Sequence, residues 1–303
     1  MRHDHGAVIS IAATTRWYAT DVSMKCQRST ILNETVGRMT MARPLELETA
    51  RSAALAAGAL LRDQFERPVG ILRTSAHDVV LEIDAIAEAI VLRRLTATFP
   101  DDAIVAEETG ARGTAPRTWL VDPLDGTINF ASRIPFFAVS IALVVRGRAV
   151  LGVVHDPTAD ETYEAARGQG AWLRIGDGEP TRLRARRTVD LANAVLGLDP
   201  GDPDEPGVPL ITALTRSIRT GRTFGSAALS LAWLAAGRLD GFVRPAGIQP
   251  LDIAAGALLA AEAGVRVTDG DGGRWPDLAT PGLTIGVIAA RPRLHQAILD
   301  RLR

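Results

Sequence analysis

The chain has 303 residues, of which 47% are hydrophobic and 23% are charged, a composition typical of a folded globular protein. Its formal net charge of −1 argues against a surface dedicated to nucleic acid or to an anionic membrane. The single cysteine, Cys26, excludes an intrachain disulfide and any structural metal site that needs several cysteines. We therefore expect a cytoplasmic protein.

The N-terminal segment 1–43 differs from the rest of the chain. It is rich in Ser and Thr and shows no sustained hydrophobic period. It also lacks the residue order of a signal peptide, and no run of 18 uncharged apolar residues indicates a transmembrane helix. We expect a disordered extension over 1–43, an N-terminal subdomain over 44–187, a C-terminal subdomain over 188–303, and no membrane partner.

Helical and strand patterns then follow in chain order. From Leu45, apolar residues recur at steps of three and four, which predicts a first helix, and Ile83–Leu95 predicts a second. A turn-rich stretch ending in His77 and Asp78 separates them. Further strands are predicted at 118–121, 137–145, 149–155, 161–166, 171–173, 194–196, 240–243 and 284–289, and further helices at 209–217, 227–236, 251–262 and 292–302. This order predicts a layered α+β protein and not a repeated βαβ array.

Two carboxylates follow the apolar strand at 118–121. Asp122 and Asp125 lie three residues apart, Gly126 permits a tight turn, and Thr127 stands where a helix can begin. Carboxylate oxygens are preferred ligands of Mg²⁺, and backbone N–H groups at a helix start can receive a phosphate. Taken alone, Asp-x-x-Asp-Gly also describes an ordinary turn.

The wider sequence resembles the inositol monophosphatase family. The segment from Asp122 to Phe130 resembles the central signature of that family. Four other motifs of the family occur in the same order. They are an Asp…Asp segment at Asp78–Asp84, a paired glutamate at 106–109, a turn before a helix at 225–228 and a C-terminal Asp-x-Ala-Ala-Gly at 251–256. The resemblance covers residues 45–303 and implies an αβαβα sandwich, of the type shared with fructose-1,6-bisphosphatase.

The resemblance implies a role for each matching residue. Glu107, Asp122 and the carbonyl of Leu124 would hold one Mg²⁺, and Asp122, Asp125 and Asp252 a second. Glu107 would share a weaker third ion through water, and Mn²⁺ can substitute. Asp84 and Thr127 would orient the attacking water, with Glu107 also counted among the catalytic residues. The phosphate or substrate would contact residues of two turns: Gly126, Thr127, Gly225, Ser226 and Ala227. Arg244 is a further candidate, for a second anionic group of the substrate, and a solvated arginine is the alternative interpretation. A homodimer is also implied.

Each of these residues also has a simpler interpretation. Asp252 and Thr127 suit helix N-termini, the paired glutamates suit a solvated loop, and Asp84 suits a helix surface. His77 and His155 have no neighbouring Cys or His, and Trp119 and Phe130 suit a core. The arginine-rich segment 182–187 is interpreted as a solvated turn, so no nucleic-acid partner is expected. The metal-site interpretation is preferred because all the acidic motifs occur together and in order.

Three positions depart from the family pattern. Leu81 replaces a common Thr, and Leu251 replaces a common Trp before the final Asp. In inositol-specific members an acidic residue lies seven positions before that Asp, whereas this chain has Pro245 there. We therefore expect Mg²⁺-dependent hydrolysis of a small phosphate monoester, by water activated at the metal. Candidate substrates are inositol, sugar, nucleotide and histidinol phosphates. The alternative is a catalytically weak member with a binding or regulatory role.

Overall fold

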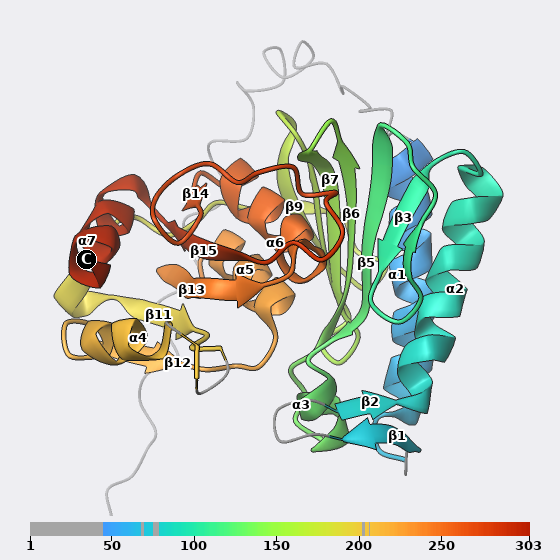
Figure 1. Cartoon of the computed structure of the whole chain (residues 1–303), viewed down its shortest axis with the longest axis horizontal. Coiled ribbons are helices and arrows are strands. Elements are labelled where there is room, and N and C mark those ends of the chain that lie inside the picture. The colour runs from blue at the N-terminus through green and yellow to red at the C-terminus, as the bar shows by residue number, and fades with distance from the viewer. Residues whose placement is uncertain (1–44, 68–69, 75–78, 202–203, 206) are drawn as a thin grey trace, which may run out of the picture. The chain divides into compact units, whose positions relative to one another are not determined.

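The computed structural model describes residues 45–67, 70–74, 79–201, 204–205 and 207–303 (Figure 1). The predictions for 1–43, His77 and Asp78 fall outside these residues. Residues 43–303 form one compact unit, so the boundary expected near residue 187 remains a proposal. No helix in the described part is long and apolar enough to cross a membrane.

A mixed, mostly antiparallel sheet forms the N-terminal half of the described residues. Its eight strands lie in the order β10-β9-β8-β7-β6-β5-β3-β4. Only β3 and β5 pair in parallel within it. The bounds are β3 Ala103–Ala106, β4 Gly110–Arg112, β5 Arg117–Asp125, β6 Ala138–Val145, β7 Arg148–Asp156, β8 Glu161–Ala166, β9 Gly170–Ile175 and β10 Thr181–Arg182. Central strands such as β6 and β8 are buried on both faces, which requires a layer of helices on each side.

A second sheet lies in the C-terminal half. Its order is β12-β11-β13-β15-β14, and β11 runs parallel to both of its neighbours. The bounds are β11 Val195–Leu198, β12 Thr220–Arg222, β13 Gly241–Ile248, β14 Arg266–Thr268 and β15 Ile285–Ala290. A third, two-stranded sheet pairs β1 Ile71–Thr74 with β2 Val79–Leu81.

Helices form the layers between and outside the two large sheets. The bounds are α1 Leu45–Gln64, α2 Glu82–Thr98, α3 Thr127–Ala131, η1 Leu191–Asn193, α4 Gly207–Thr215, α5 Ala227–Ala235, α6 Pro250–Glu262 and α7 Pro292–Leu302. Helices α1 and α2 contact the eight-stranded sheet, α5 and α6 contact both sheets, and α4 and α7 contact the five-stranded sheet (Figure 1). The layers therefore form the expected αβαβα sandwich.

The central helix pair packs closely because its side chains are small. All residues of α6 from Ile253 to Ala260 are buried, as expected for a helix between two sheets. At Gly256, an added Cβ would lie 2.7 Å from the Cβ of Leu231 and 2.9 Å from the carbonyl oxygen of Ala228. This glycine therefore permits the close approach of α6 to α5.

The longer predicted elements are confirmed, and the omissions are short strands. The turn-rich stretch predicted between the first two helices also contains the short strand β1, and β2 follows it, and neither strand was predicted. The strand predicted at 240–243 extends to Ile248 through Pro245, and its register with β15 shifts between Arg244 and Ile248. Such an irregularity accommodates a proline, which has no N–H to donate to the ladder.

Candidate active site

The C-terminal end of β5 carries two of the predicted metal-binding acidic residues. Asp122 and Asp125 are both buried, and the register of β5 with β6 shifts between them. Gly126 follows with a φ of 103°, and a Cβ there would lie 3.1 Å from the carbonyl oxygen of Phe136. The left-handed backbone reverses the chain at once into α3, as expected for the Asp-Gly-Thr sequence.

Asp125 is hydrogen-bonded to a segment that lies 101 to 103 residues later in the chain. Its Oδ2 accepts hydrogen bonds from Ser226 Oγ at 2.5 Å and from the Ala228 N–H at 2.7 Å. Its Oδ1 accepts a longer one from the Ala227 N–H at 3.3 Å. The N-terminus of α5, where Ser226 is the N-cap, therefore holds a carboxylate supplied by β5.

Four carboxyl groups influence one another at this point. Asp122 hydrogen-bonds to Glu107, and its pKa is raised by burial and by the charges of Glu107, Asp125 and Asp252. Burial also raises the pKa of Asp252, with further contributions from the charges of Asp125 and Glu107. Because Coulomb interactions weaken with distance, these four groups from three separate sequence motifs form one acidic cluster.

Burial sets the protonation of the other two members of this cluster. It raises the pKa of Asp125 to about 6 despite the hydrogen bonds from Ser226 and α5. It also raises the pKa of Glu107 to about 7, with the charges of Glu108 and Asp84 adding to this, although the Glu107 residue is exposed to solvent and the effect is smaller there than at the buried Asp122 and Asp252. Without a cation, burial therefore opposes ionisation of the cluster.

The residues expected to act on water lie beside these acids. Thr127 Oγ1 donates to the Leu124 carbonyl at 3.0 Å, and the Leu124 N–H donates to Asp122 Oδ1 at 3.0 Å. Asp84, on the first turn of α2, is buried, and its Oδ2 accepts the Leu81 N–H at 2.8 Å. Asp84 is therefore a buried residue, and Thr127 is the first residue of α3, with Gly126 as its N-cap.

The expected substrate contacts have partners within the protein. The N–H of Ala227 and the hydroxyl of Ser226 already bind Asp125, and Gly225 packs against Asn129, with a φ of 75°. The Arg244 guanidinium pairs with Asp199 at 2.6 Å and with Glu205 at 3.1 Å. A substrate anion at Arg244 would therefore have to compete with two carboxylates.

The donor set suits a hard divalent cation. The cluster supplies carboxylate oxygens from four residues and the Leu124 carbonyl, with neither His nor Cys, as Mg²⁺ prefers. No three of the described acidic, His or Cys residues are arranged as metal ligands, and the side chains of Asp125 and Asp252 instead accept hydrogen bonds within the protein. Binding a cation would therefore require these side chains to reorient.

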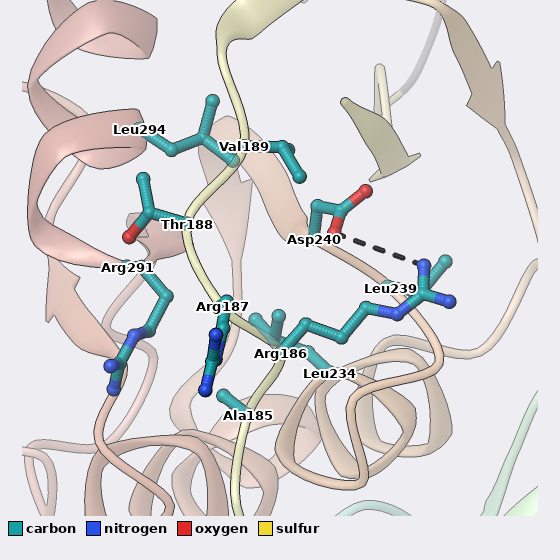
Figure 2. A pocket seen from close by; sticks show the side chains of 10 residues that line it. All are labelled: Ala185, Arg186, Arg187, Thr188, Val189, Leu234, Leu239, Asp240, Arg291 and Leu294. Atoms are coloured by element: carbon teal, nitrogen blue, oxygen red, sulfur yellow. Dashed lines mark ion pairs between the residues drawn. The ribbon is translucent and has the colours of Figure 1, made fainter. Parts of the chain in front are cut away.

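A separate hollow in the structure does not include this acidic cluster. It is lined by the 185–189 segment, by α5 and its following turn, and by α7, and Arg187 and Arg291 point the same way within it (Figure 2). Arg186 reaches toward Asp240 at 4.0 Å (Figure 2). None of the expected site residues lines this hollow.

Comparisons with known proteins agree with this geometry. The model of the inositol monophosphatase family matches residues 45–303. The chain belongs to the inositol monophosphatase family. The inositol-1-monophosphatase of Mesorhizobium japonicum is 38% identical over 273 residues, which cover 87% of this chain and 98% of the relative. The Nus factor SuhB of Escherichia coli K12 is also 38% identical, over 267 residues that cover 85% of this chain and 95% of the relative.

Solved structures of family members share the fold. The extragenic suppressor protein SuhB of Bartonella henselae has a TM-score of 0.75 at 33% identity, with 85% of this chain and 98% of that chain covered. The inositol monophosphatase of Anabaena has a TM-score of 0.71 at 33% identity, with 85% and 94% covered. Family membership supports a phosphatase-type activity for this chain.

Two buried polar residues near the cluster were missed by sequence reasoning. Asn129 donates from Nδ2 to the carbonyls of Phe136 and Phe224, both at 2.7 Å, and so joins α3 to the turn before α5. Glu88, on α2, accepts two backbone N–H groups from the loop that follows Glu107. Asn129 lies within the signature segment Asp122–Phe130, but no role was predicted for its side chain. Glu88 follows Asp84 by four residues, a spacing that places both on one face of α2 and could have indicated its position near the site.

Proposed function

We propose that this protein is a Mg²⁺-dependent phosphatase that hydrolyses a small phosphate monoester. The proposal rests on the position of the acids of the site: the buried Asp122 and Asp125 end β5, Asp125 is bound by the N-terminus of α5, and burial and neighbouring acidic charges raise the pKa of Asp122 and of Asp252. Such a cluster is unfavourable without a cation, because burial and like charges both oppose ionisation. Membership in the inositol monophosphatase family supports the same reaction class.

The proposed division of roles follows the contacts. Glu107, Asp122, Asp125, Asp252 and the Leu124 carbonyl would hold two or three Mg²⁺ ions. When bound, Mg²⁺ neutralises phosphate charge and lowers the pKa of a coordinated water.

The side chains of Asp84 and Thr127 would orient the attacking water. Thr127 Oγ1 is held by the Leu124 carbonyl, so its position is tied to that of a metal ligand. The N–H groups of Gly126 and Thr127 would receive the phosphate.

The substrate is proposed to differ from myo-inositol phosphate, or to bind without the sugar contact that inositol-specific relatives make. Pro245 occupies the position of the acidic residue in those members and has no side-chain acceptor for a sugar hydroxyl. The adjacent Arg244 is held by Asp199 and Glu205. Arg244 is therefore already engaged by two carboxylates, and Pro245 itself offers no side-chain acceptor to a sugar hydroxyl.

The test is phosphate release from a panel of inositol, sugar, nucleotide and histidinol phosphates, with Mg²⁺ and with a chelator. Asp122→Asn serves as the site variant. Asp156→Asn is the matched control, because Asp156 is equally buried but accepts hydrogen bonds from Thr158 and Ala159 at a surface turn. We expect Mg²⁺-dependent release that Asp122→Asn abolishes and Asp156→Asn retains. Inositol phosphate as clearly the best substrate would reject the substrate part of the proposal.

A second candidate function is the binding of a macromolecular partner. It is supported by the relatives of 37–38% identity that carry the name Nus factor. It does not require loss of catalysis, since every expected metal ligand is retained in this chain. A folded wild-type protein that binds neither Mg²⁺ nor Mn²⁺ and releases no phosphate from the panel would favour this second candidate.

A further inference from the structure

Glu88 is a buried glutamate with no role in the reaction proposed above. It lies on α2 with 1% of its surface exposed. Its Oε2 accepts the Glu108 N–H at 2.7 Å, and its Oε1 accepts the Thr109 N–H at 3.0 Å. Both carboxylate oxygens therefore hold the two residues that directly follow Glu107.

The loop held by Glu88 is the one that presents Glu107. Strand β3 ends at Ala106 and β4 begins at Gly110, so only three residues form the connection. On one side, the Glu107 N–H donates to the Val121 carbonyl of β5 at 3.2 Å. On the other side, the next two N–H groups bind Glu88. The backbone that carries the Glu107 carboxylate is thus fixed to β5 and to α2.

A carboxylate is the side chain that this arrangement requires. Two parallel N–H groups need two acceptors, and an ionised Glu has two acceptor oxygens and no donor. Gln offers one oxygen and an NH₂ group, which would face one of the N–H donors.

Glu88 also shares its helix with a predicted catalytic residue. Asp84 lies four residues earlier on α2 and is equally buried, so the two carboxylates project from successive turns of one helix face. Helix α2 therefore supplies Asp84 directly and fixes the Glu107 loop through Glu88.

We propose that Glu88 is a positioning residue that fixes the loop backbone so that the Glu107 carboxylate can reach a divalent cation shared with Asp122. This inference rests on the proposed function. It assigns to Glu88 a contribution to metal affinity that acts through Glu107 and not through contact with the ion. Residues that orient metal ligands in this way typically change metal affinity or activity by about 10- to 100-fold when substituted.

The test compares Glu88→Gln with Glu164→Gln, another glutamate that is 2% exposed. Glu164 lies on β8 and pairs with Arg51 on α1 at 3.4 Å. Binding of Mn²⁺ is measured without substrate, from the spin-resonance signal of the free ion, and Mg²⁺ saturation curves are measured for phosphate release. Thermal unfolding in chelator shows that each variant is folded.

We expect Glu88→Gln to weaken Mn²⁺ binding by about 10- to 100-fold and to raise the half-saturating Mg²⁺ concentration by a similar factor. At saturating Mg²⁺ its KM for the phosphate ester should stay within about twofold of wild type. Glu164→Gln should keep wild-type Mn²⁺ affinity even where its unfolding temperature drops. If Glu88→Gln does not fold, Glu88→Asp provides the same test, because its shorter side chain cannot reach both N–H groups.

Two results would overturn the inference. Wild-type Mn²⁺ affinity in a folded Glu88 variant, or equal losses of Mn²⁺ affinity in the Glu88 and Glu164 variants, would show that Glu88 only stabilises the loop. Either result would leave the phosphatase assignment intact. A wild-type protein that binds no Mn²⁺ and releases no phosphate would overturn the proposed function and this inference together.

Discussion

Asp125 carries the most quantitative prediction, because burial opposes its ionisation in the folded protein. Its pKa rises from 3.8 to about 6, and one pH unit corresponds to about 1.4 kcal/mol. The folded protein therefore binds more protons than the unfolded chain between about pH 4 and pH 6. Its free energy of unfolding should fall as pH rises through this range, and the full cost of about 3 kcal/mol should persist above pH 6.

Asp125→Asn removes this cost while keeping the size of the side chain. At pH 8 in chelator, we expect the variant to be more stable than wild type by about 1–3 kcal/mol, with part of the gain lost because the amide accepts fewer hydrogen bonds than the carboxylate. The assay is urea unfolding with and without Mg²⁺. Wild type should be stabilised by Mg²⁺, and the variant should be stabilised less, because only one of the two proposed ion sites loses a ligand. A variant that is less stable than wild type in chelator, or that keeps the full wild-type Mg²⁺ stabilisation, would refute the reasoning.

Four further outcomes are expected. Asp122→Asn should lower kcat by at least about 100-fold in a folded protein, and near-normal turnover would remove Asp122 as a shared ligand of two ions. Thr127→Ala should lower kcat more than it raises KM, and the reverse pattern would assign Thr127 to substrate binding. Burial lowers the pKa of His155 to about 4, so this group should cost up to about 3 kcal/mol of stability as pH falls from 6.5 to 4. The stability difference between wild type and His155→Gln, measured by thermal unfolding, should therefore change over that range. A difference that does not change with pH would show that the imidazole titrates normally. Arg238→Ala should destabilise by about 2 kcal/mol in urea, because it leaves the buried Glu161 carboxylate without its two guanidinium contacts, and an unchanged midpoint would contradict this.

Hydrophobic period and motif order were sufficient to predict the layered fold and the acidic motifs. The Ala-rich segment of α6 and the two-sided burial of β6 have strong patterns, so their elements were confirmed within a few residues. The short strands β1, β2 and β4 were not predicted, because three or four residues carry too little periodic signal and pairing is decided by distant partners.

The partners of the polar side chains could not be read from the sequence. The turn motif at 225–228 indicated a helix start, but the chain alone does not show that its N–H groups bind Asp125. Likewise, the sequence alone does not show that Asp199 and Glu205 pair with the Arg244 guanidinium. These pairings join residues 39 to 103 positions apart, and their geometry arises only from tertiary packing.

The contact at Gly256 has a consequence for how the chain can vary. Gly256 lies one turn after Asp252 on α6 and touches Ala228, whose N–H holds Asp125. A single methyl group there would wedge the two helices apart and carry one acidic residue away from the other. The spacing of the acidic residues thus depends on Gly256, a buried residue that contacts neither solvent nor substrate.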